Sequence, residues 1–242
     1  MTAITTASES VCVPVTTTFD DAAMDELVFG NLLNGRAFLT IGEQILFERE
    51  QQFYITRIDN EQQSYTTADY QQLPQGAPYQ LIDGKLAFMA SPLYKHQDTI
   101  GNLSDLIRPY VKKNKLGKVQ FAPLDVYFDE ANVFQPDLLF ISNERKGIIK
   151  KFIHGAPDLI VEVLSSNKNH DLGKKKTVYG QYNVLEYWAI DYEKESLDLY
   201  LNKEAVLELD RSYQGDEAVR STVLPDFSFT LSEIFEEEEV EE

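Results

Sequence analysis

A single glutamate interrupts an apolar stretch of the sequence. Glu162 stands within Leu159-Ile-Val-Glu-Val-Leu164, whose composition is typical of a strand buried on both faces. A carboxylate in such a strand is costly unless it is paired or bound to a cation. Glu162 is therefore a candidate metal ligand, with a buried ion pair as the alternative that the sequence leaves open.

Asp137 is a second carboxylate that strand geometry could bring to Glu162. It follows Gln135-Pro136 and precedes an apolar segment over 138–141, so it stands at the start of a predicted strand. Neighbouring strands lie about 4.8 Å apart, so facing residues on two of them can bind one divalent ion. Asp158 is a poorer partner, because it precedes Glu162 on the same strand by about 13 Å. A plain strand-start or turn role for Asp137 is the alternative.

A lysine at helical spacing completes the set. Lys174, Lys175 and Lys176 lie in a predicted helix over 171–182. Lys175 shares the inward face of that helix with three residues that follow it, Val178, Tyr179 and Tyr182, whereas its two neighbours are turned by about 100° to either side. We therefore expect Lys175 to point at the carboxylates.

The predicted elements around these residues follow the order helix, three strands, helix, strand, with one further strand after them. The segments are a helix over 95–114, strands over 119–128, 134–141 and 159–165, the helix over 171–182, and strands over 186–191 and 197–201. Gly117 is expected to end the first helix. Asp83-Gly84 predicts a hairpin of residues 79–82 with 85–90.

The flanks of this region carry weaker signals. Residues 1–20 are expected to be a mobile tail, 20–33 a short helix, and 37–47 with 52–58 a hairpin. Thr66 or Thr67 would cap a short helix that Pro74 ends. The sequence thus predicts three parts: an N-terminal tail with a small hairpin extension over 1–64, a main domain over 65–235, and an acidic disordered tail over 236–242.

The charge is strongly negative but unevenly distributed. The formal net charge is −18, which argues against a nucleic-acid partner at first sight. However, residues 108–118, 143–151 and 168–176 hold 13 of the 22 lysines and arginines and only 2 of the 40 acids. Each stretch alone is most simply a solvated face. We expect the three together to surround the candidate site.

Several classes of function are excluded by what the sequence lacks. Cys12 is the only cysteine, which excludes an intramolecular disulfide and a cysteine-based zinc site. No phosphate-binding loop precedes Gly173, and no Gly-x-Ser-x-Gly elbow occurs. No apolar run is long enough to span a membrane and no secretory signal begins the chain, so we expect a cytoplasmic protein without a membrane partner.

The ordered set of motifs resembles a known group of nucleases. Pro136-Asp137, Glu162 and the element order resemble the PD-(D/E)XK superfamily. More narrowly, residues 79 to about 202 resemble the Uma-two family of restriction endonucleases through seven segments: Tyr79-Gln-Leu-Ile-Asp-Gly84, Ser91-Pro92 with His96, Ala122-Pro-Leu-Asp-Val126, Gln135-Pro-Asp-Leu138, Gly155-Ala-Pro-Asp-Leu-Ile-Val-Glu-Val-Leu-Ser165, Asp171 with Lys175 and Tyr179, and Glu186-Tyr-Trp-Ala-Ile-Asp191.

The resemblance implies a fold, a cofactor and a reaction. The fold would be an α/β restriction-endonuclease-like core, with a mixed β-sheet flanked by helices and an N-terminal β-rich extension. Asp137, Glu162 and the Val163 carbonyl would hold Mg²⁺, or Mn²⁺, for hydrolysis of DNA. Lys175 would replace the lysine that the superfamily carries two residues after the acid, where Leu164 stands. His96, Lys174 and Lys176 would contact substrate.

The sequence also departs from the family pattern. Gln80 and Lys85 occupy positions where the upstream hairpin is expected to carry acids, and Ser166 replaces a usual proline. A catalytically degenerate module that binds nucleic acid or a protein is therefore the alternative function. RNA as substrate and assembly as a homodimer both stay open.

Overall fold

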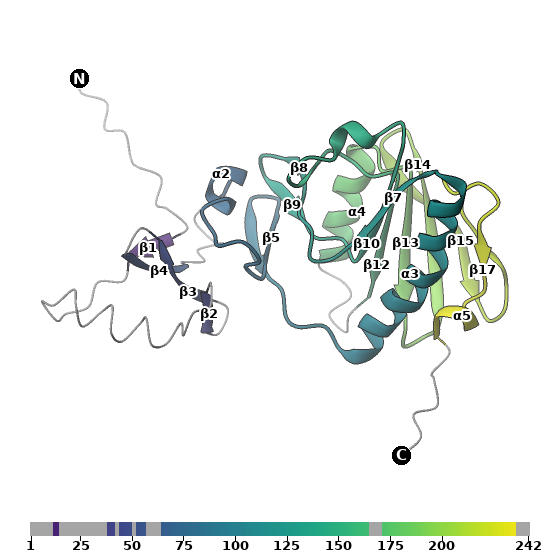
Figure 1. Cartoon of the computed structure of the whole chain (residues 1–242), viewed down its shortest axis with the longest axis horizontal. Coiled ribbons are helices and arrows are strands. Elements are labelled where there is room, and N and C mark those ends of the chain that lie inside the picture. Colours follow the sequence, from purple (N-terminus) through teal and green to yellow (C-terminus); the bar gives the residue numbers. More distant parts are fainter. Residues whose placement is uncertain are drawn as a thin grey trace, which may run out of the picture. The chain divides into compact units, whose positions relative to one another are not determined.

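The computed structural model describes residues 12–14, 38–41, 44–49, 52–56, 64–164 and 171–235. They fall into two compact units, Met1–Met89 and Ala90–Glu242, each coloured along the chain in Figure 1. The three-part division expected from the sequence stays a prediction. The expected helix over 20–33 and the acidic tail over 236–242 lie outside the described residues. Within them, no helix has the length and apolar character needed to cross a membrane.

The first unit begins with four short antiparallel strands in the order β1-β4-β3-β2. They are β1 (Cys12–Pro14), β2 (Phe38–Ile41), β3 (Gln44–Arg49) and β4 (Gln52–Thr56). The expected hairpin is present as β3 and β4, but the segment expected as its first strand folds into two. The expectation of a mobile tail is wrong for residues 12–14, since Val13 pairs with Ile55.

In the rest of the first unit, the helix cap and the hairpin turn lie where the sequence predicts them. Thr66 caps α2 (Thr67–Tyr70) in a capping box, in which Thr66 N donates to Asp69 Oδ2 at 2.8 Å. The helix ends at Tyr70, earlier than Pro74. β5 (Tyr79–Ile82) and β6 (Lys85–Phe88) form the predicted hairpin, with φ of 52° at Asp83 and 70° at Gly84, as a type I′ turn requires.

A six-stranded mixed sheet forms the centre of the second unit, in the order β15-β14-β13-β12-β10-β7. Only β12 and β13 run parallel; the other neighbours are antiparallel. The bounds are β7 (Gly117–Phe121), β10 (Leu138–Ser142), β12 (Leu159–Val163), β13 (Glu186–Asp191), β14 (Ser196–Lys203) and β15 (Val206–Gln214). This arrangement confirms the mixed α/β fold expected from the sequence.

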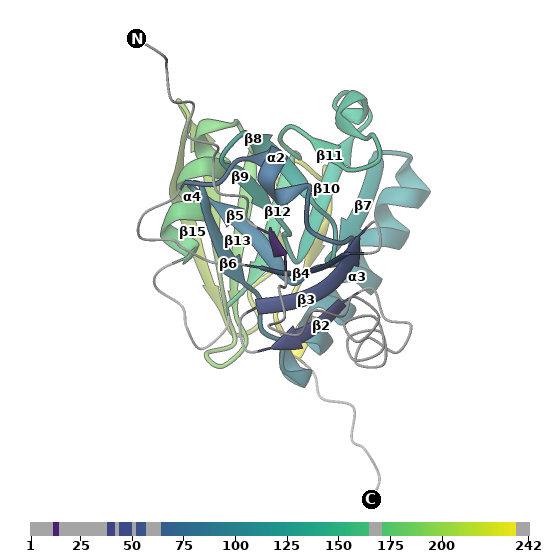
Figure 2. The same cartoon turned by 90° about the vertical axis from the view of Figure 1, so that its left-hand side faces the viewer.

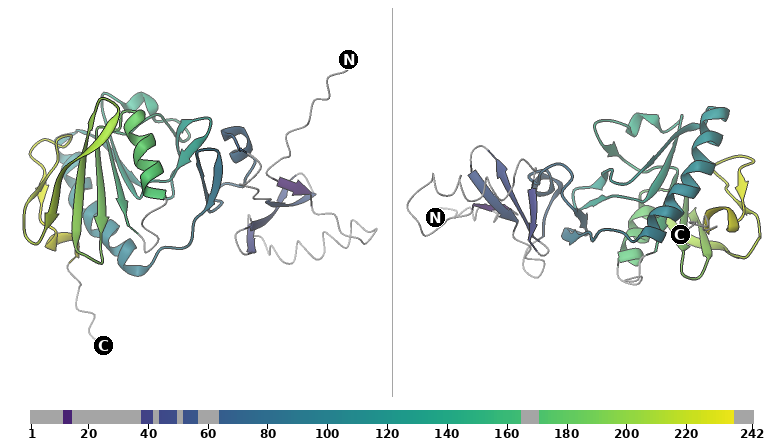
Figure 3. Two further views of the ribbon diagram at one scale, coloured as in Figure 1. Left: turned by 180° about the vertical axis from the view of Figure 1, so that it is seen from behind. Right: turned by 60° about the horizontal axis from the view of Figure 1, so that its bottom comes forward.

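The two long helices cover opposite faces of this sheet, as the views in Figures 2 and 3 agree. α3 (Tyr94–Asn114) buries Ile100, Leu103 and Ile107 in one core with alternate sheet residues, including Val161 and Val163. Because side chains alternate along a strand, Glu162 between them points to the other face. That face is covered by α4 (Asp171–Gln181).

Gly117 has a different role from the one expected. α3 ends at Asn114, and Lys115 adopts the left-handed conformation with φ of 55°. Gly117 instead begins β7, where a Cβ atom would lie 2.0 Å from the Ile141 carbonyl oxygen. The glycine is therefore needed for close approach of two strands, and the helix ends without it.

The remaining elements subdivide two predicted strands and add others. The predicted strand over 119–128 is split into β7 and β8, and the one over 134–141 contains the end of β9 as well as β10. The elements outside the central sheet are β8 (Val126–Asp129), β9 (Asn132–Phe134), a 3₁₀ turn (Lys146–Ile148), β11 (Ile153–His154), β16 (Val219–Arg220), β17 (Ser228–Phe229) and α5 (Ser232–Phe235). No strand was predicted after residues 197–201, so β15 to β17 are additional to the predicted elements.

Glu186 is a buried carboxylate with a structural role. Its side chain is fully buried and accepts hydrogen bonds from Trp188 Nε1 at 2.6 Å and from Thr222 N at 2.7 Å, and another from Val223 N. These bonds fasten the segment after β16 to β13, since burial of an unpaired carboxylate would be costly.

Candidate active site

Asp137 and Glu162 face each other at one end of β10 and β12. Leu138 pairs with Val161 in the antiparallel register, so the next step along both strands places Asp137 opposite Glu162. Directly opposed residues project from the same face of a sheet. Asp137 Oδ2 also accepts a hydrogen bond of 2.7 Å from Val163 N, which fixes this carboxylate against the end of β12.

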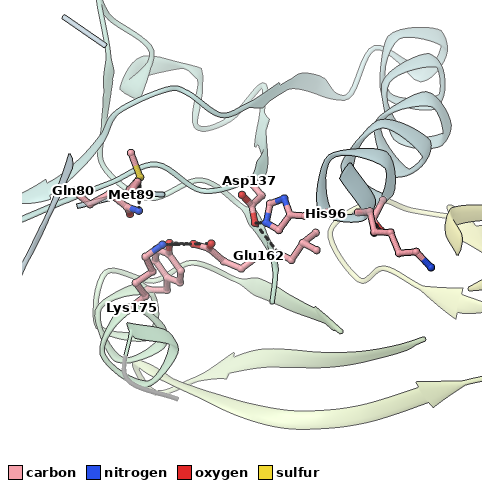
Figure 4. A network of polar contacts seen from close by, with 10 residues as sticks. Gln80, Met89, His96, Asp137, Glu162 and Lys175 are labelled. Carbon is pink, nitrogen blue, oxygen red and sulfur yellow. Dashed lines mark hydrogen bonds and ion pairs between the residues drawn. The ribbon is translucent and has the colours of Figure 1, made fainter. Parts of the chain in front are cut away.

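Glu162 is held by two side chains of α4. Lys175 Nζ lies 3.2 Å from Glu162 Oε1 and 3.4 Å from Oε2 (Figure 4). Tyr179 OH donates to Oε1 at 2.6 Å. Lys175 and Tyr179 are four residues apart on one helix face, which brings both to the same carboxylate. Glu162 and Lys175 are each only 7% exposed.

The ionisation of Glu162 depends on these neighbours. Burial raises its pKa, the Lys175 charge lowers it, and the nearby Asp137 charge raises it again, with a net rise. The pKa of the Tyr179 hydroxyl is well above its usual value, chiefly because of burial, so this group remains a proton donor at neutral pH. Lys175 is therefore the main group that keeps a buried carboxylate charged.

His96 approaches Asp137 from the first turn of α3. Its Nε2 lies 3.4 Å from Asp137 Oδ2, with the two side chains 12% and 15% exposed. Burial lowers the pKa of His96, but the hydrogen bond and charge of Asp137, with smaller contributions from the Val163 backbone and Glu162, raise it overall. The other ring nitrogen, Nδ1, has no hydrogen-bond partner among the described residues.

We expect Asp137→Asn to lower the pKa of His96, because the variant removes the charge that outweighs desolvation. The folded pKa of His96 is raised, so its contribution to stability is fully present below the unfolded value of about 6.5 and is lost as the pH rises through the folded value. An NMR titration of the His96 ring in both proteins measures the shift. His154, which is exposed, serves as the internal control. An unchanged His96 titration in the variant would show that Asp137 does not act on it.

Three further residues were predicted from the sequence as part of the site: Lys174, Lys176 and Val163. Lys174 is exposed, and Lys176 Nζ lies 4.3 Å from the ring centroid of Tyr200. The Val163 amide N donates a hydrogen bond to Asp137 Oδ2, which places Val163 beside that carboxylate. Tyr179 was not predicted as a site residue, although its spacing of four from Lys175 was a usable signal. Within the described residues, no group of three or more His, Cys, Asp and Glu side chains has the geometry of a metal site.

The basic stretches do not all surround this site. His96 and Lys112 are sixteen residues apart in α3, which corresponds to about 24 Å along the helix axis. Lys118 in β7 and Lys146 in the turn after β10 lie at the end of the sheet opposite to Asp137. The expectation that the basic stretches gather around the carboxylates is therefore wrong for the first stretch and for Lys146.

Comparisons with known proteins agree with this fold. Residues 67–232 match the model of the Uma2 family, described as "Putative restriction endonuclease". Among solved structures, a protein from Anabaena variabilis ATCC 29413, titled a putative nuclease, is similar with a TM-score of 0.61 and 18% sequence identity. The match covers 71% of this chain and 97% of that one, and at this identity it shows the fold alone. No curated protein matches the chain.

Proposed function

The chain belongs to the Uma2 family, and we propose that it is a divalent-metal-dependent endonuclease that hydrolyses DNA phosphodiester bonds. The observation that carries the proposal is Glu162, a buried carboxylate opposite Asp137 whose charge is maintained by Lys175. Burying a charged carboxylate and a charged lysine costs folding free energy. A role in phosphoryl-transfer chemistry would explain why the protein contains such a pair.

The donor atoms fit Mg²⁺ or Mn²⁺. Both are hard cations that favour oxygen ligands, and Mg²⁺ commonly uses one or two carboxylates together with water and substrate phosphate oxygens. Asp137 and Glu162 provide the carboxylates on one face of the sheet, and the Val163 carbonyl is a further candidate ligand. When bound, the ion would polarise the scissile phosphate and lower the pKa of a water molecule.

Lys175 is the proposed electrostatic group of the site. Its ammonium is buried beside Glu162, where a charge acts more strongly than it would in water. It would stabilise the negative charge that develops on the phosphate in the transition state, or orient the attacking water. His96, whose Nε2 lies 3.4 Å from Asp137 Oδ2, would hold that carboxylate in place and contact the substrate.

A non-catalytic binding module is the second candidate function. The observation in its favour is that, in the part of the chain that the structure describes, no third acidic, histidine or cysteine side chain completes a metal cluster. Gln80 and Lys85 stand where upstream acids are expected, and Gln80 Nε2 donates to Met89 Sδ at 2.9 Å. Such a module would bind nucleic acid or a protein without cutting.

Cleavage and metal binding together test the proposal. We expect supercoiled plasmid to be nicked with Mg²⁺ or Mn²⁺ and to remain intact with chelator, and a labelled RNA to be cut more slowly. Calorimetry should show Mn²⁺ binding that Asp137→Asn and Glu162→Gln each weaken by at least about tenfold, because each removes a charged ligand.

Glu144→Gln is the matched control, since it removes one exposed carboxylate from the turn that follows β10. Equal Mn²⁺ binding by all four proteins would refute the metal site. Metal binding without cleavage of any nucleic acid would favour the binding module instead.

A further inference from the structure

Five exposed lysines gather at the end of the sheet that is distant from the carboxylates. Lys112 and Lys113 are in the last turn of α3, Lys115 follows that helix, Lys118 is in β7, and Lys146 begins the 3₁₀ turn after β10. We call them the distal lysine surface. Glu144 is the only acid in residues 108–118 and 142–148.

Hydrogen bonds from Asn143 and the pairing of β7 with β10 hold these segments together. Asn143 N donates to the Leu116 carbonyl at 3.1 Å, and Asn143 Nδ2 donates to the Lys115 carbonyl at 2.6 Å. Gly117 and Ser142 are Cα partners in the ladder between β7 and β10. The lysines of the helix end and of the turn therefore share one surface, although more than twenty-five residues separate Lys118 from Lys146 in sequence.

The lysines of this surface are not neutralised by structural ion pairs. None of the five is within ion-pair distance of an acid among residues 64–164 and 171–235. By contrast, basic residues at the opposite edge of the sheet are paired: Lys194 with Asp191, Lys203 with Glu208 and Arg211 with Glu217. In a chain of net charge −18, an unpaired basic group of this size is a local exception.

The helix dipole explains only part of this surface. Lysines at a helix C-terminus interact favourably with the partial negative charge there, which accounts for Lys112 and Lys113. The effect falls off within the last turn, so it does not account for Lys118 or Lys146. A polyanionic partner that contacts helix, strand and turn together accounts for all five.

We propose that the distal lysine surface anchors duplex DNA by its phosphates, away from the scissile bond. The inference rests on the proposed function and adds a second contact region to it. The separation from His96 of about 24 Å corresponds to about seven base pairs of B-DNA at 3.4 Å each. Phosphate contacts carry affinity without reading sequence, so this surface would hold the duplex while the carboxylate site acts on one strand.

The test is DNA binding measured in chelator, where no cleavage can occur. The variant carries Lys112→Gln, Lys113→Gln, Lys118→Gln and Lys146→Gln; Lys115 is left unchanged because of its left-handed backbone. The matched control carries Lys194→Gln, Lys203→Gln, Arg211→Gln and Arg220→Gln, which removes the same charge elsewhere. Circular dichroism melts check that both proteins fold.

With a 30-base-pair duplex, the distal variant should reduce the slope of log affinity against log salt by about 3.6, or about 0.9 for each lost phosphate contact. Between 50 and 200 mM salt, the wild type should then lose on the order of a hundredfold more affinity than this variant. The control should retain most of the wild-type slope. Equal slopes for the variant and the control would overturn the proposal, because net charge alone would then explain binding.

Two further outcomes separate this inference from the proposed function. Wild-type binding with the expected loss in the variant, but no cleavage with any metal, would support the anchor and refute the nuclease. Cleavage by the wild type, together with unchanged DNA binding in the variant, would support the nuclease and refute the anchor. Poly-L-glutamate at equal charge is the second probe, and binding to it that is tighter than binding to the duplex and is lost in the distal variant would overturn the assignment to DNA in favour of an acidic protein.

Discussion

Lys175→Met should reduce cleavage by about 10²- to 10³-fold while the chain still folds. The ammonium group is buried, 3.2 Å from Glu162, and its charge acts mainly on the transition state. Loss of that charge should also raise the pKa of Glu162 further, because Lys175 is the main group that lowers it. Metal binding in the variant should therefore persist but require a higher pH than in the wild type.

The neighbouring lysines are the matched controls for this variant. Lys174→Met and Lys176→Met remove the same charge one residue away, from side chains that do not contact Glu162. Both should keep a kcat within about twofold of the wild type, since surface charges act weakly at this distance, whereas loss of their expected contact with substrate would appear as a higher KM. Wild-type cleavage by Lys175→Met would remove Lys175 from the mechanism.

A lysine supplied from the strand should restore part of the activity. Leu164 is two residues after Glu162, so its side chain lies on the same side of the strand, about 6.6 Å along it. The double variant Leu164→Lys with Lys175→Met would place the ammonium where the wider superfamily carries it. Cleavage above that of Lys175→Met alone would support a charge role that is independent of the element providing it.

The sequence predicted the centre of the fold because periodicity and register were both informative there. The continuous apolar run around Glu162 indicated a doubly buried strand, and the helical spacing of Lys175 indicated which of three lysines points inward. Those two patterns are local, and each is set by the geometry of a single element. By contrast, the prediction that Asp137 faces Glu162 also required the assumption that their two strands are neighbours in the sheet.

An acid within an apolar strand, the pattern that identified Glu162, is not by itself evidence of a functional residue. Glu186 is an equally buried acid in an apolar strand, yet its partners Thr222 and Val223 are far away in the sequence. A sequence pattern does not distinguish a carboxylate paired with backbone amides from one paired with a lysine. Tertiary contacts decide between a structural and a functional role for such acids.

The position of the basic stretches could not be predicted for a related reason. Lys112 is close in sequence to His96, but an α-helix extends about 1.5 Å per residue and carries the two far apart. Sequence proximity therefore overestimated spatial proximity. β15 was missed because its alternation is weak: only Leu207 and Tyr213 of its nine residues are buried.

The Glu162–Lys175 pair should cost the protein stability, and a double-mutant cycle can measure this. Removing one partner leaves the other as an uncompensated buried charge, so Lys175→Met and Glu162→Gln should each lower the free energy of unfolding by about 3 kcal/mol at pH 7.5. The double variant should be as stable as the wild type, or more stable by about 1 to 4 kcal/mol, because it replaces the ion pair with neutral groups of similar size. Glutamine can still accept the hydrogen bond from Tyr179.

The pH dependence of Lys175→Met gives this prediction a specific sign. Without Lys175, the raised pKa of Glu162 means that the folded state binds a proton more tightly than the unfolded state, whose value is about 4.5. The stability of the variant should therefore be close to that of the wild type near pH 4.5 and should decline as the pH rises through the folded pKa of Glu162. Urea unfolding of the four proteins at pH 5 and pH 7.5 measures both effects. Single-variant losses that simply add in the double variant, with no dependence on pH, would mean that the two side chains do not form an interacting buried pair.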